Sequence, residues 1–351
     1  MVHQYIIMAI EPETSSSLPL VSIVVPVYNG ETYLAESLDS IITQTYPNTE
    51  ILVMDDASTD NTPDIIKSYG DRVTHIRNES NLGQFGNVNK GIEKTRGKFI
   101  CVYHADDIYK PEIVEKEARY LIENKLAGAV FCLDIFIDAK GKVYNQLDIP
   151  EIVRGGGPFN YTIILNTLLT YKNVFLVGPT SMVRRDVYFD VGLYNGDEYG
   201  IAGDLEMWAR IAKSYDLGII EEHLQYYRHD HGNLSQNYYR LRTETEIHFR
   251  IMQQHLDSGG LAIAESDSLK ANRAHWSQDL LMVAINAYIK NDLAMCRKRL
   301  RQIKVGELLG SARIQRGRLL VLYILLSILC RIPRLSFIAS LFKKRWHANK
   351  N

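Results

Sequence analysis

Short apolar runs alternate with helix-like segments along the first 137 residues of the chain. Four runs have the length and apolar character of buried strands, at residues 21–26, 50–54, 98–103 and 129–137. The helix-like segments between them carry apolar residues every three or four positions. These positions are Leu34, Leu38, Ile41 and Ile42, then Phe85, Val88 and Ile92, then Val114, Ala118, Leu121 and Ile122. Strands that alternate with helices predict βαβ units and a mainly parallel sheet in a Rossmann-like α/β domain.

Polar residues gather where three of these apolar runs end. The clusters are Tyr28 with Asn29, Asp55 with Asp56, and Asp106 with Asp107. In parallel sheets, ligands bind beyond the carboxyl ends of the strands, so the three clusters predict one site at that edge. Any single cluster is also explained by turn formation, because these residue types favour turns.

Asp106 and Asp107 are the cluster with the clearest chemistry. Adjacent carboxylates repel each other unless a cation or strong hydrogen-bond donors compensate them. A hard divalent ion such as Mn²⁺ or Mg²⁺ does so while it bridges to phosphate oxygens. The alternative is an acidic helix N-terminus, since Pro111 opens a helix-like segment nearby.

The composition and net charge are those of a globular chain and give it no general affinity for polyanions. The chain has 351 residues, of which 46% are hydrophobic and 23% charged, and its net charge is −1. Nucleic acid is therefore not an expected partner. We expect buried thiols in a reducing compartment, because the cysteines lie far apart and form no C-x-x-C pair. They are Cys101, Cys132, Cys296 and Cys330.

In its motifs, the chain resembles the family 2 glycosyltransferases, which have the GT-A fold. The matching segments are residues 21–29, 53–60, 81–83, 106–107, 178–181, 192–194, 203–208 and 227–229. The resemblance covers residues 19–235 and rests on the order and spacing of these segments. It implies a metal-dependent hexosyltransferase that uses a nucleotide-sugar donor and inverts the anomeric configuration.

The resemblance also implies a role for particular residues. Asp56 is similar to the aspartate that accepts a hydrogen bond from the base, and a carboxylate there favours UDP, although dTDP and GDP stay open. Asp204 resembles the general base, which must reach the acceptor hydroxyl. Asp106 and Asp107 resemble the metal and ribose ligands. The expected nucleotide contacts are Pro26, Val27, Tyr28, Asn29, Asp56 and Asp106.

The chain departs from the family pattern at three places, one of which is Asn87–Val88–Asn89, where an arginine is often found. His104 stands where the D-x-D-D motif begins with aspartate, and Gly203 replaces the acid that usually precedes the base. His104 is a candidate phosphate or acceptor contact, or else a hydrogen-bonded histidine without a role in binding. Further candidates of this kind are Arg228, as a phosphate contact, and Trp208, as a sugar platform or a core residue. His229 is a candidate metal ligand.

The last third of the chain is expected to be helical and basic. Between positions 297 and 345 only Glu307 opposes the bases, which are Arg297, Lys298, Arg299, Arg301, Lys304, Arg313, Arg316, Arg318, Arg331, Arg334, Lys343, Lys344 and Arg345. The apolar run 319–330 is too short to span a bilayer. It suits peripheral docking on an anionic membrane, with packing on protein as the alternative. We therefore expect a cytoplasmic protein at the inner face of the cell membrane.

These observations predict an organisation and a function. The expected parts are a tail at 1–18, a GT-A domain at 19–238 with a nucleotide-sugar half (19–135) and an acceptor half (171–238), and a helical region at 239–351 with an amphipathic segment at 313–345. The expected reaction transfers a sugar to a glycan or lipid-linked acceptor in polysaccharide or cell-envelope biosynthesis. The alternatives are a sugar nucleotidyltransferase and a catalytically silent nucleotide-binding module.

Overall fold

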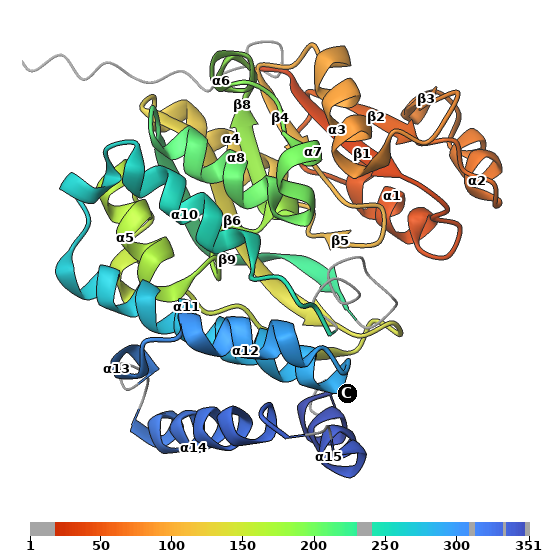
Figure 1. Ribbon diagram of the computed structural model, residues 1–351. Helices are drawn as coiled ribbons and strands as arrows, with labels where there is room; N and C mark the ends of the chain where they lie inside the picture. Colours follow the sequence, from red (N-terminus) through yellow and green to blue (C-terminus); the bar gives the residue numbers. More distant parts are fainter. Residues whose placement is uncertain (1–17, 230–240, 309–312, 333–334, 348–351) are drawn as a thin grey trace, which may run out of the picture.

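A mixed sheet runs through the first two thirds of the described chain (Figure 1). The computed structural model describes residues 18–229, 241–308, 313–332 and 335–347. The predicted tail, except Leu18, and the predicted boundary at 238 lie outside these residues. Within them, nine strands have the order β3-β2-β1-β4-β8-β6-β9-β5, and β7 pairs with β6. The strands are β1 (Val21–Val27), β2 (Thr49–Asp55), β3 (Thr74–Arg77), β4 (Phe99–Val102), β5 (Ile108–Tyr109), β6 (Ala127–Ile137), β7 (Val143–Gln146), β8 (Ser181–Arg184) and β9 (Asp216–Arg228).

The first half of the sheet is parallel, as the sequence predicts. Strand β1 pairs in parallel with β2 and β4, and β2 pairs in parallel with β3. Beyond β4 the sheet is mixed, because β8 runs antiparallel to both β4 and β6 while β9 runs parallel to β6. The α/β fold is thus confirmed, with a parallel half and a mixed half.

Helices cover both faces of the sheet. The α-helices of this part are α1 (Leu34–Ile42), α2 (Thr62–Ser68), α3 (Gly83–Lys94), α4 (Ile113–Glu123), α5 (Tyr161–Tyr171), α6 (Arg185–Val191), α7 (Gly196–Tyr199), α8 (Gly203–Ala212) and α10 (Ile247–Asp257). One apolar core holds α1, α2 and α4 against the sheet. The other core holds α3, α5, α6, α8 and α10 against the opposite face. Burial of these apolar faces is the main favourable contribution to the fold.

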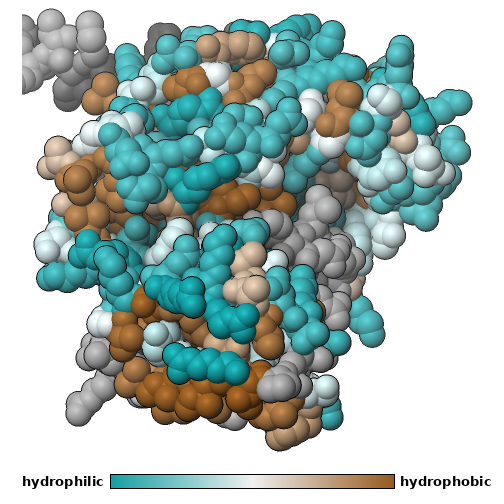
Figure 2. Space-filling model, viewed as in Figure 1, coloured by the Kyte–Doolittle hydropathy of each residue, from teal (hydrophilic) through white to brown (hydrophobic). Residues whose placement is uncertain are grey.

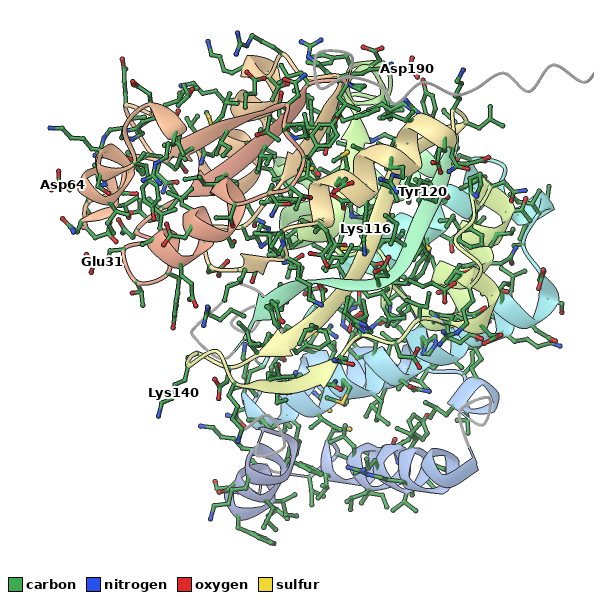
Figure 3. All side chains as sticks on the ribbon, turned by 180° about the vertical axis from the view of Figure 1, so that it is seen from behind. Glu31, Asp64, Lys116, Tyr120, Lys140 and Asp190 are labelled. Carbon is green, nitrogen blue, oxygen red and sulfur yellow. The ribbon has the colours of Figure 1, made fainter. Side chains whose placement is uncertain are left out.

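Figure 3 shows the second view of this packing, with Lys116 and Tyr120 of α4 beside the sheet. The Tyr120 hydroxyl donates to the carbonyl of Gly156 at 2.7 Å. A Cβ on Gly218 of β9 would lie 2.1 Å from the Tyr120 ring. Glycine at 218 therefore allows α4 to pack closely on β9, the strand that carries several site residues.

The C-terminal helices form a third apolar core of their own. They are α11 (Ser266–Ile289), α12 (Leu293–Gln302), α13 (Val305–Leu308), α14 (Arg313–Leu329) and α15 (Ser336–His347). Helix α11 connects them to the catalytic part because it contacts α5. In the part of the chain that the structure describes, no helix has the length and apolar character to cross a membrane.

One face of this helical region exposes apolar side chains, which Figure 2 shows along α14. Val321, Ile324 and Ile328 on α14 are 63%, 50% and 54% exposed, and Phe337 and Leu341 on α15 are 65% and 58% exposed. The predicted helical region is confirmed, and its amphipathic segment has an apolar face turned to solvent.

Candidate active site

The loops after β1 and β2 are fastened to each other by hydrogen bonds. The N–H of Asn29 donates to Ser58 Oγ at 3.0 Å, and Asn29 Oδ1 accepts from the N–H of Thr59 at 2.8 Å. Asn29 has a φ of 51°, in the left-handed region that asparagine tolerates better than most residues. Beside this link the Tyr28 side chain is 51% exposed, so a ligand can reach it.

Pro26 and Val27 close β1 at the same edge. Pro26 pairs with Met54 of β2, but it lies beyond Val24, the last residue of β1 that pairs with β4. The N–H that proline lacks is therefore not needed for pairing with β4. The carbonyl of Val27 accepts from the N–H of Asp56 at 2.9 Å. The structure thus brings four of the predicted nucleotide contacts, residues 26–29, next to Asp56.

Hydrogen bonds and ion pairs from other residues of the chain compensate the charge of Asp55. Its side chain is 0% exposed, and Oδ1 accepts from the N–H of Ser58 at 2.9 Å. Oδ2 pairs with Arg77 at 2.7 Å and lies 3.5 Å from the His75 ring nitrogen. These partners hold the loop after β2 to the neighbouring strand β3, which is a structural role that the sequence did not reveal.

Asp56 is also satisfied by donors from the chain. Oδ1 accepts from the Asn78 side chain and the N–H of Leu82, both at 2.8 Å, and Oδ2 accepts from the N–H of Gly83 at 3.0 Å. Since α3 begins at Gly83, the carboxylate caps this helix. A carboxylate has about four acceptor positions, so one is left for a ligand. Asn78 and Leu82 also line a cavity of about 270 Å³. The base contact of Asp56 stays a prediction.

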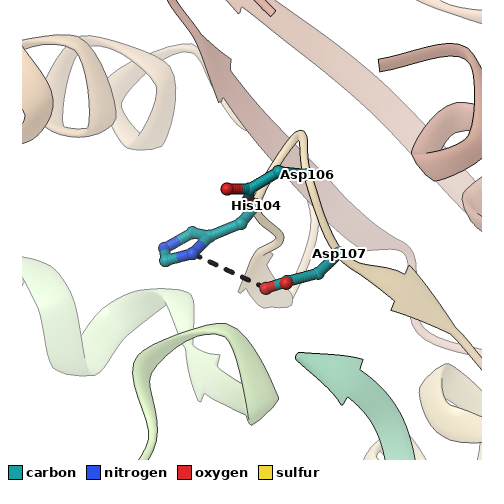
Figure 4. A group of neighbouring side chains, drawn as sticks. All are labelled: His104, Asp106 and Asp107. Carbon is teal, nitrogen blue, oxygen red and sulfur yellow. Dashed lines mark ion pairs between the residues drawn. The ribbon is translucent and has the colours of Figure 1, made fainter. Parts of the chain in front are cut away.

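His104, Asp106 and Asp107 lie together just after β4 (Figure 4). Within the described part of the chain they form a group whose potential ligand atoms all lie within 4.8 Å of one another. His104 Nδ1 is 3.7 Å from Asp107 Oδ2, and the His104 side chain is 33% exposed. Burial lowers the pKa of His104 and the Asp106 charge opposes that shift. A neutral imidazole is the form that can bind a metal.

Asp107 is held by β9. Its Oδ2 accepts from the Gln225 amide at 2.7 Å and its Oδ1 from the N–H of Arg228 at 2.8 Å. Burial raises the pKa of Asp107 well above its usual value, and the charges of Asp106 and Asp134 raise it further. The two hydrogen bonds oppose this shift but do not cancel it. The donors of the chain therefore stabilise the charged form of Asp107 only in part.

Asp134 of β6 adds a buried carboxyl to this group. It is 1% exposed, and neither of its oxygens has a hydrogen-bond partner among the described residues. Burial raises the pKa of Asp134 to about 8. Its neighbour in the β6–β9 pairing is Gln225, whose Oε1 is likewise buried without a partner.

This donor set fits a divalent cation. Asp106 is only partly buried, so its carboxylate is the accessible member of the pair, whereas Asp107 is 1% exposed. A hard cation prefers carboxylate oxygens and relieves the repulsion between them. Asp106 is thus the better placed direct ligand, with Asp107 and His104 beside it.

Arg228 and His229 follow at the end of β9. The Arg228 guanidinium is 2% exposed, pairs with Glu36 at 2.6 Å, donates to the carbonyl of Asp106 at 2.9 Å and lies over the Tyr33 ring. These contacts give it a positioning role, and a phosphate contact stays a prediction. His229 is not part of the group of potential ligands described above, and its metal role also stays a prediction.

Asp204 lies in the first turn of α8 and is partly buried. Burial raises the pKa of its carboxyl to about 6, and the N–H of Leu205, which donates to Oδ1 at 2.7 Å, opposes this shift. A carboxyl with such a pKa is suited to accept a proton near neutral pH.

The fold brings Asp204 to the same end of β4 as the acid group. A Cβ on Gly178 would lie 3.7 Å from Asp204 Oδ2, so the carboxyl lies against the turn at Gly178–Thr180. This turn contacts β4 and leads into β8, whose Met182 pairs with Cys101 near the end of β4. The predicted base and the predicted metal ligands therefore flank one edge of the sheet.

Two features beside Asp204 have a packing explanation. A Cβ at Gly203 would lie 2.8 Å from the Phe85 ring, so glycine fits the close packing at this position. Trp208 is 0% exposed and makes edge-to-face contacts with Phe131 and Tyr194, so it occupies the core position that was its alternative.

Comparisons with known proteins agree with this geometry. The Glycosyl transferase family 2 model matches residues 22–192. An uncharacterized glycosyltransferase of Haemophilus influenzae is 34% identical over 226 residues, which cover 63% of this chain and 68% of the relative. A putative teichuronic acid biosynthesis glycosyltransferase, TuaG of Bacillus subtilis, is 25% identical and covers 67% of this chain and 89% of its own length.

A solved structure shares the fold. The crystal structure of S. aureus TarS 1–349 in complex with UDP-GlcNAc superposes with a TM-score of 0.54 at 17% identity, and covers 89% of this chain and 91% of TarS 1–349. Together with the sequence relatives, this likeness confirms the predicted GT-A fold. The chain belongs to glycosyltransferase family 2, and it is a glycosyltransferase.

Proposed function

We propose that this glycosyltransferase moves a sugar from a UDP-sugar to a hydroxyl of a glycan or lipid-linked acceptor, with Mn²⁺ or Mg²⁺ at Asp106 and Asp107 and with inversion at the anomeric carbon. The observation that carries the proposal is the group of His104, Asp106 and Asp107, whose potential ligand atoms lie within 4.8 Å of one another, with Asp204 at the same edge of the sheet. TarS was crystallised with UDP-GlcNAc, which supports UDP as the carrier.

The residues divide the chemistry between them. Asp204 accepts the proton of the acceptor hydroxyl as its oxygen bonds to the anomeric carbon. The bond from that carbon to the diphosphate breaks on the opposite face, which inverts the configuration. Asp106 and Asp107 would hold the cation, and such an ion would supply positive charge to offset that of the departing diphosphate. Residues 26–29 and Asp56 bind the nucleoside.

The alternatives have less support. A sugar nucleotidyltransferase is disfavoured because the chain belongs to a glycosyltransferase family. A silent binding module has no need for an aspartate with a pKa near 6 at the edge of a cavity. The relation to TuaG favours a role in envelope polysaccharide synthesis.

Peripheral contact with the inner face of the cell membrane is the second part of the proposal. Its support is the exposed apolar face of α14 and α15, which is bordered by the exposed bases Arg318, Arg331, Lys343 and Lys344. Apolar burial and cationic residues act together on anionic lipid. In a flotation assay with phosphatidylglycerol vesicles, Ile324→Glu should reduce binding. Val143→Glu, at an exposed valine on β7, is the matched control, and equal binding of both variants would refute membrane docking through this face.

A thermal-shift screen tests the donor site. The full chain is melted with UDP, GDP, dTDP or CDP, each with and without Mn²⁺, and saturating ligand should stabilise it by about 2–4 kcal/mol. We expect the largest metal-dependent shift with UDP. The shift should disappear in Asp106→Ala/Asp107→Ala and persist in Asp64→Ala, which changes an exposed acid of α2. No shift with any nucleotide would contradict the proposed donor site.

A further inference from the structure

A cavity of about 360 Å³ opens beside Asp204, where the sheet domain meets the helices that follow it. Its volume is at the lower end of the ~300–1,000 Å³ range of small-molecule sites. The lining residues come from three segments, which are 171–174 after α5, 201–205 at the start of α8, and 246–248 at the start of α10. The second and third segments lie outside the residues that the family model matches, 22–192.

The charged side chains of the cavity wall that the first and third segments form are paired with one another. Lys172, whose φ of 63° is unusual for a residue with a side chain, forms an ion pair with Glu246. Glu246 also accepts from Arg242 at 3.2 Å, and Arg242 in turn pairs with the buried Asp279. Of these four groups, Lys172 and Glu246 line the cavity, and since they neutralise each other, Asp204 is the remaining charged group of the lining.

His248 contributes an uncharged polar group to the same wall. It is 6% exposed, and neither ring nitrogen has a hydrogen-bond partner within the described residues. Burial lowers the pKa of His248 to about 3, and the nearby Lys172 and His275 lower it further. Both nitrogens are buried, so the neutral ring lines the wall without adding charge to it.

We propose that this cavity is the acceptor subsite and that it selects an uncharged, hydroxyl-rich sugar, with Lys172, Glu246 and His248 as specificity-determining residues. The inference rests on the proposed function, because it takes Asp204 as the base that receives the acceptor proton. An anionic sugar is disfavoured since Lys172 is already neutralised by Glu246 and the Asp204 carboxylate would repel it. Without α10 the subsite would lack one wall, so the C-terminal region completes the site.

The test measures UDP release by the full chain with Mn²⁺ and UDP-GlcNAc, UDP-glucose or UDP-galactose. Methyl glucoside and methyl N-acetylglucosaminide are added as neutral acceptors, and methyl glucuronide is added as the matched anion. We expect the neutral glycosides to raise UDP release above the rate in water, while the glucuronide leaves it unchanged. A stronger response to the glucuronide, or no response to any glycoside while UDP release in water persists, would overturn the inference.

Three variants, one of them a control, locate the effect. Val174→Trp fills the cavity from a lining valine that is 42% exposed, and it should lower the acceptor-stimulated rate by about tenfold or more. Val143→Trp changes a valine of 47% exposure outside the lining and should respond as the wild type does. Glu246→Gln frees Lys172 while Arg242 keeps Asp279, so it should gain a response to methyl glucuronide.

The thermal shift with UDP and Mn²⁺ distinguishes failure of this inference from failure of the proposed function. If Val174→Trp keeps this shift and still responds fully to neutral glycosides, the acceptor binds elsewhere and the inference is wrong while the proposed function stands. A Glu246→Gln variant that stays indifferent to the glucuronide contradicts the charge argument. If the wild type shows neither the shift nor UDP release, the proposed function fails and the inference fails with it.

Discussion

The two carboxylate pairs of this enzyme have the same sequence pattern and opposite surroundings. Asp55 ends β2 and Asp56 follows it, and Asp106–Asp107 lies in the turn after β4, so each pair stands near the end of an apolar strand. Protein donors reach all four oxygens of the first pair. The second pair has Asp134 as a further acid nearby, and its Asp107 keeps a strongly raised pKa.

The difference shows what a pair of acids at a strand end means physically. When the chain supplies arginine, backbone N–H groups and an amide, the pair fastens loops and caps a helix. When burial outweighs the donors that the chain supplies, as at Asp107, a cation would stabilise the charged form on binding. Only the second pair then has the character of a metal site, although both have the sequence of one.

The largest expected effect comes from removal of the accessible acid of the second pair. Asp106→Ala should lower sugar transfer by about 10²–10³-fold, because metal stabilisation of the leaving diphosphate is worth several kcal/mol. Transfer is measured as UDP release at saturating Mn²⁺. Asp64→Ala, at an exposed acid of α2, should leave the rate unchanged. Full activity of Asp106→Ala would remove the functional half of the comparison.

The effects on stability should be the reverse of the effects on rate, with the larger loss of stability at the first pair. Asp55→Ala leaves Ser58 N–H and Arg77 without their acceptor and should cost about 2–3 kcal/mol of unfolding free energy, less than for a fully buried ion pair because the Arg77 side chain is 44% exposed. Asp107→Asn should cost little or stabilise the metal-free protein. Its raised pKa means that the wild type loses stability as pH rises above 3.8, the ordinary value, and asparagine removes that loss.

Urea unfolding at pH 7 with EDTA measures both changes. Added Mn²⁺ should then raise the stability of the wild type and not that of Asp107→Asn. Equal costs for Asp55→Ala and Asp107→Asn would mean that the two pairs are equivalent after all.

Much of the fold could be predicted because its central strands are continuous apolar runs. Strands β1, β2, β4 and β6 and the helices between them follow from that pattern. Strand β9 escaped prediction since Glu221, Glu222 and His223 interrupt its apolar residues. Strand β8, of four residues, is too short to give a pattern.

The site was predictable in its residue types and not in their environments. Sequence alone could not separate Asp55–Asp56 from Asp106–Asp107, because compensation depends on partners distant in the chain. Gln225, which holds Asp107, is 118 residues away from it. Asp134 lies within an apolar strand and has no neighbouring motif that would mark it as buried beside the site. Glu246 and His248 belong to a helix beyond the residues that the resemblance covers.

Asp204 lies between the two pairs in how far its surroundings favour the charged carboxylate. We expect loss of its charge to lower the rate less than Asp106→Ala does. It is the base only when ionised, so kcat should fall below a pKa of about 6 and should be about tenfold lower at pH 5 than on the plateau. The measurement is a pH profile of UDP release, with UDP binding followed over the same range as a control. An acid limb near pH 4 would show that the Leu205 N–H compensates this carboxyl as fully as Asp55 is compensated.

The smallest expected effect sharpens the comparison at Asp134, the buried acid that neither pair includes. Its pKa of about 8 lies above the ordinary 3.8, so the folded state holds its proton more tightly than the unfolded state does. Stability from this group is therefore present at low pH and is lost as pH rises between these two values.

Asp134→Asn keeps the shape of the side chain and cannot ionise, so its advantage in stability over the wild type should grow by about 1 kcal/mol from pH 6 to pH 7. Urea unfolding at the two pH values measures this difference, and Asp138→Asn, at a half-buried acid beyond the end of β6, is the control. A constant difference would mean that a donor of the protein compensates Asp134, and the repulsion at the second pair would then arise from Asp106 and Asp107 alone.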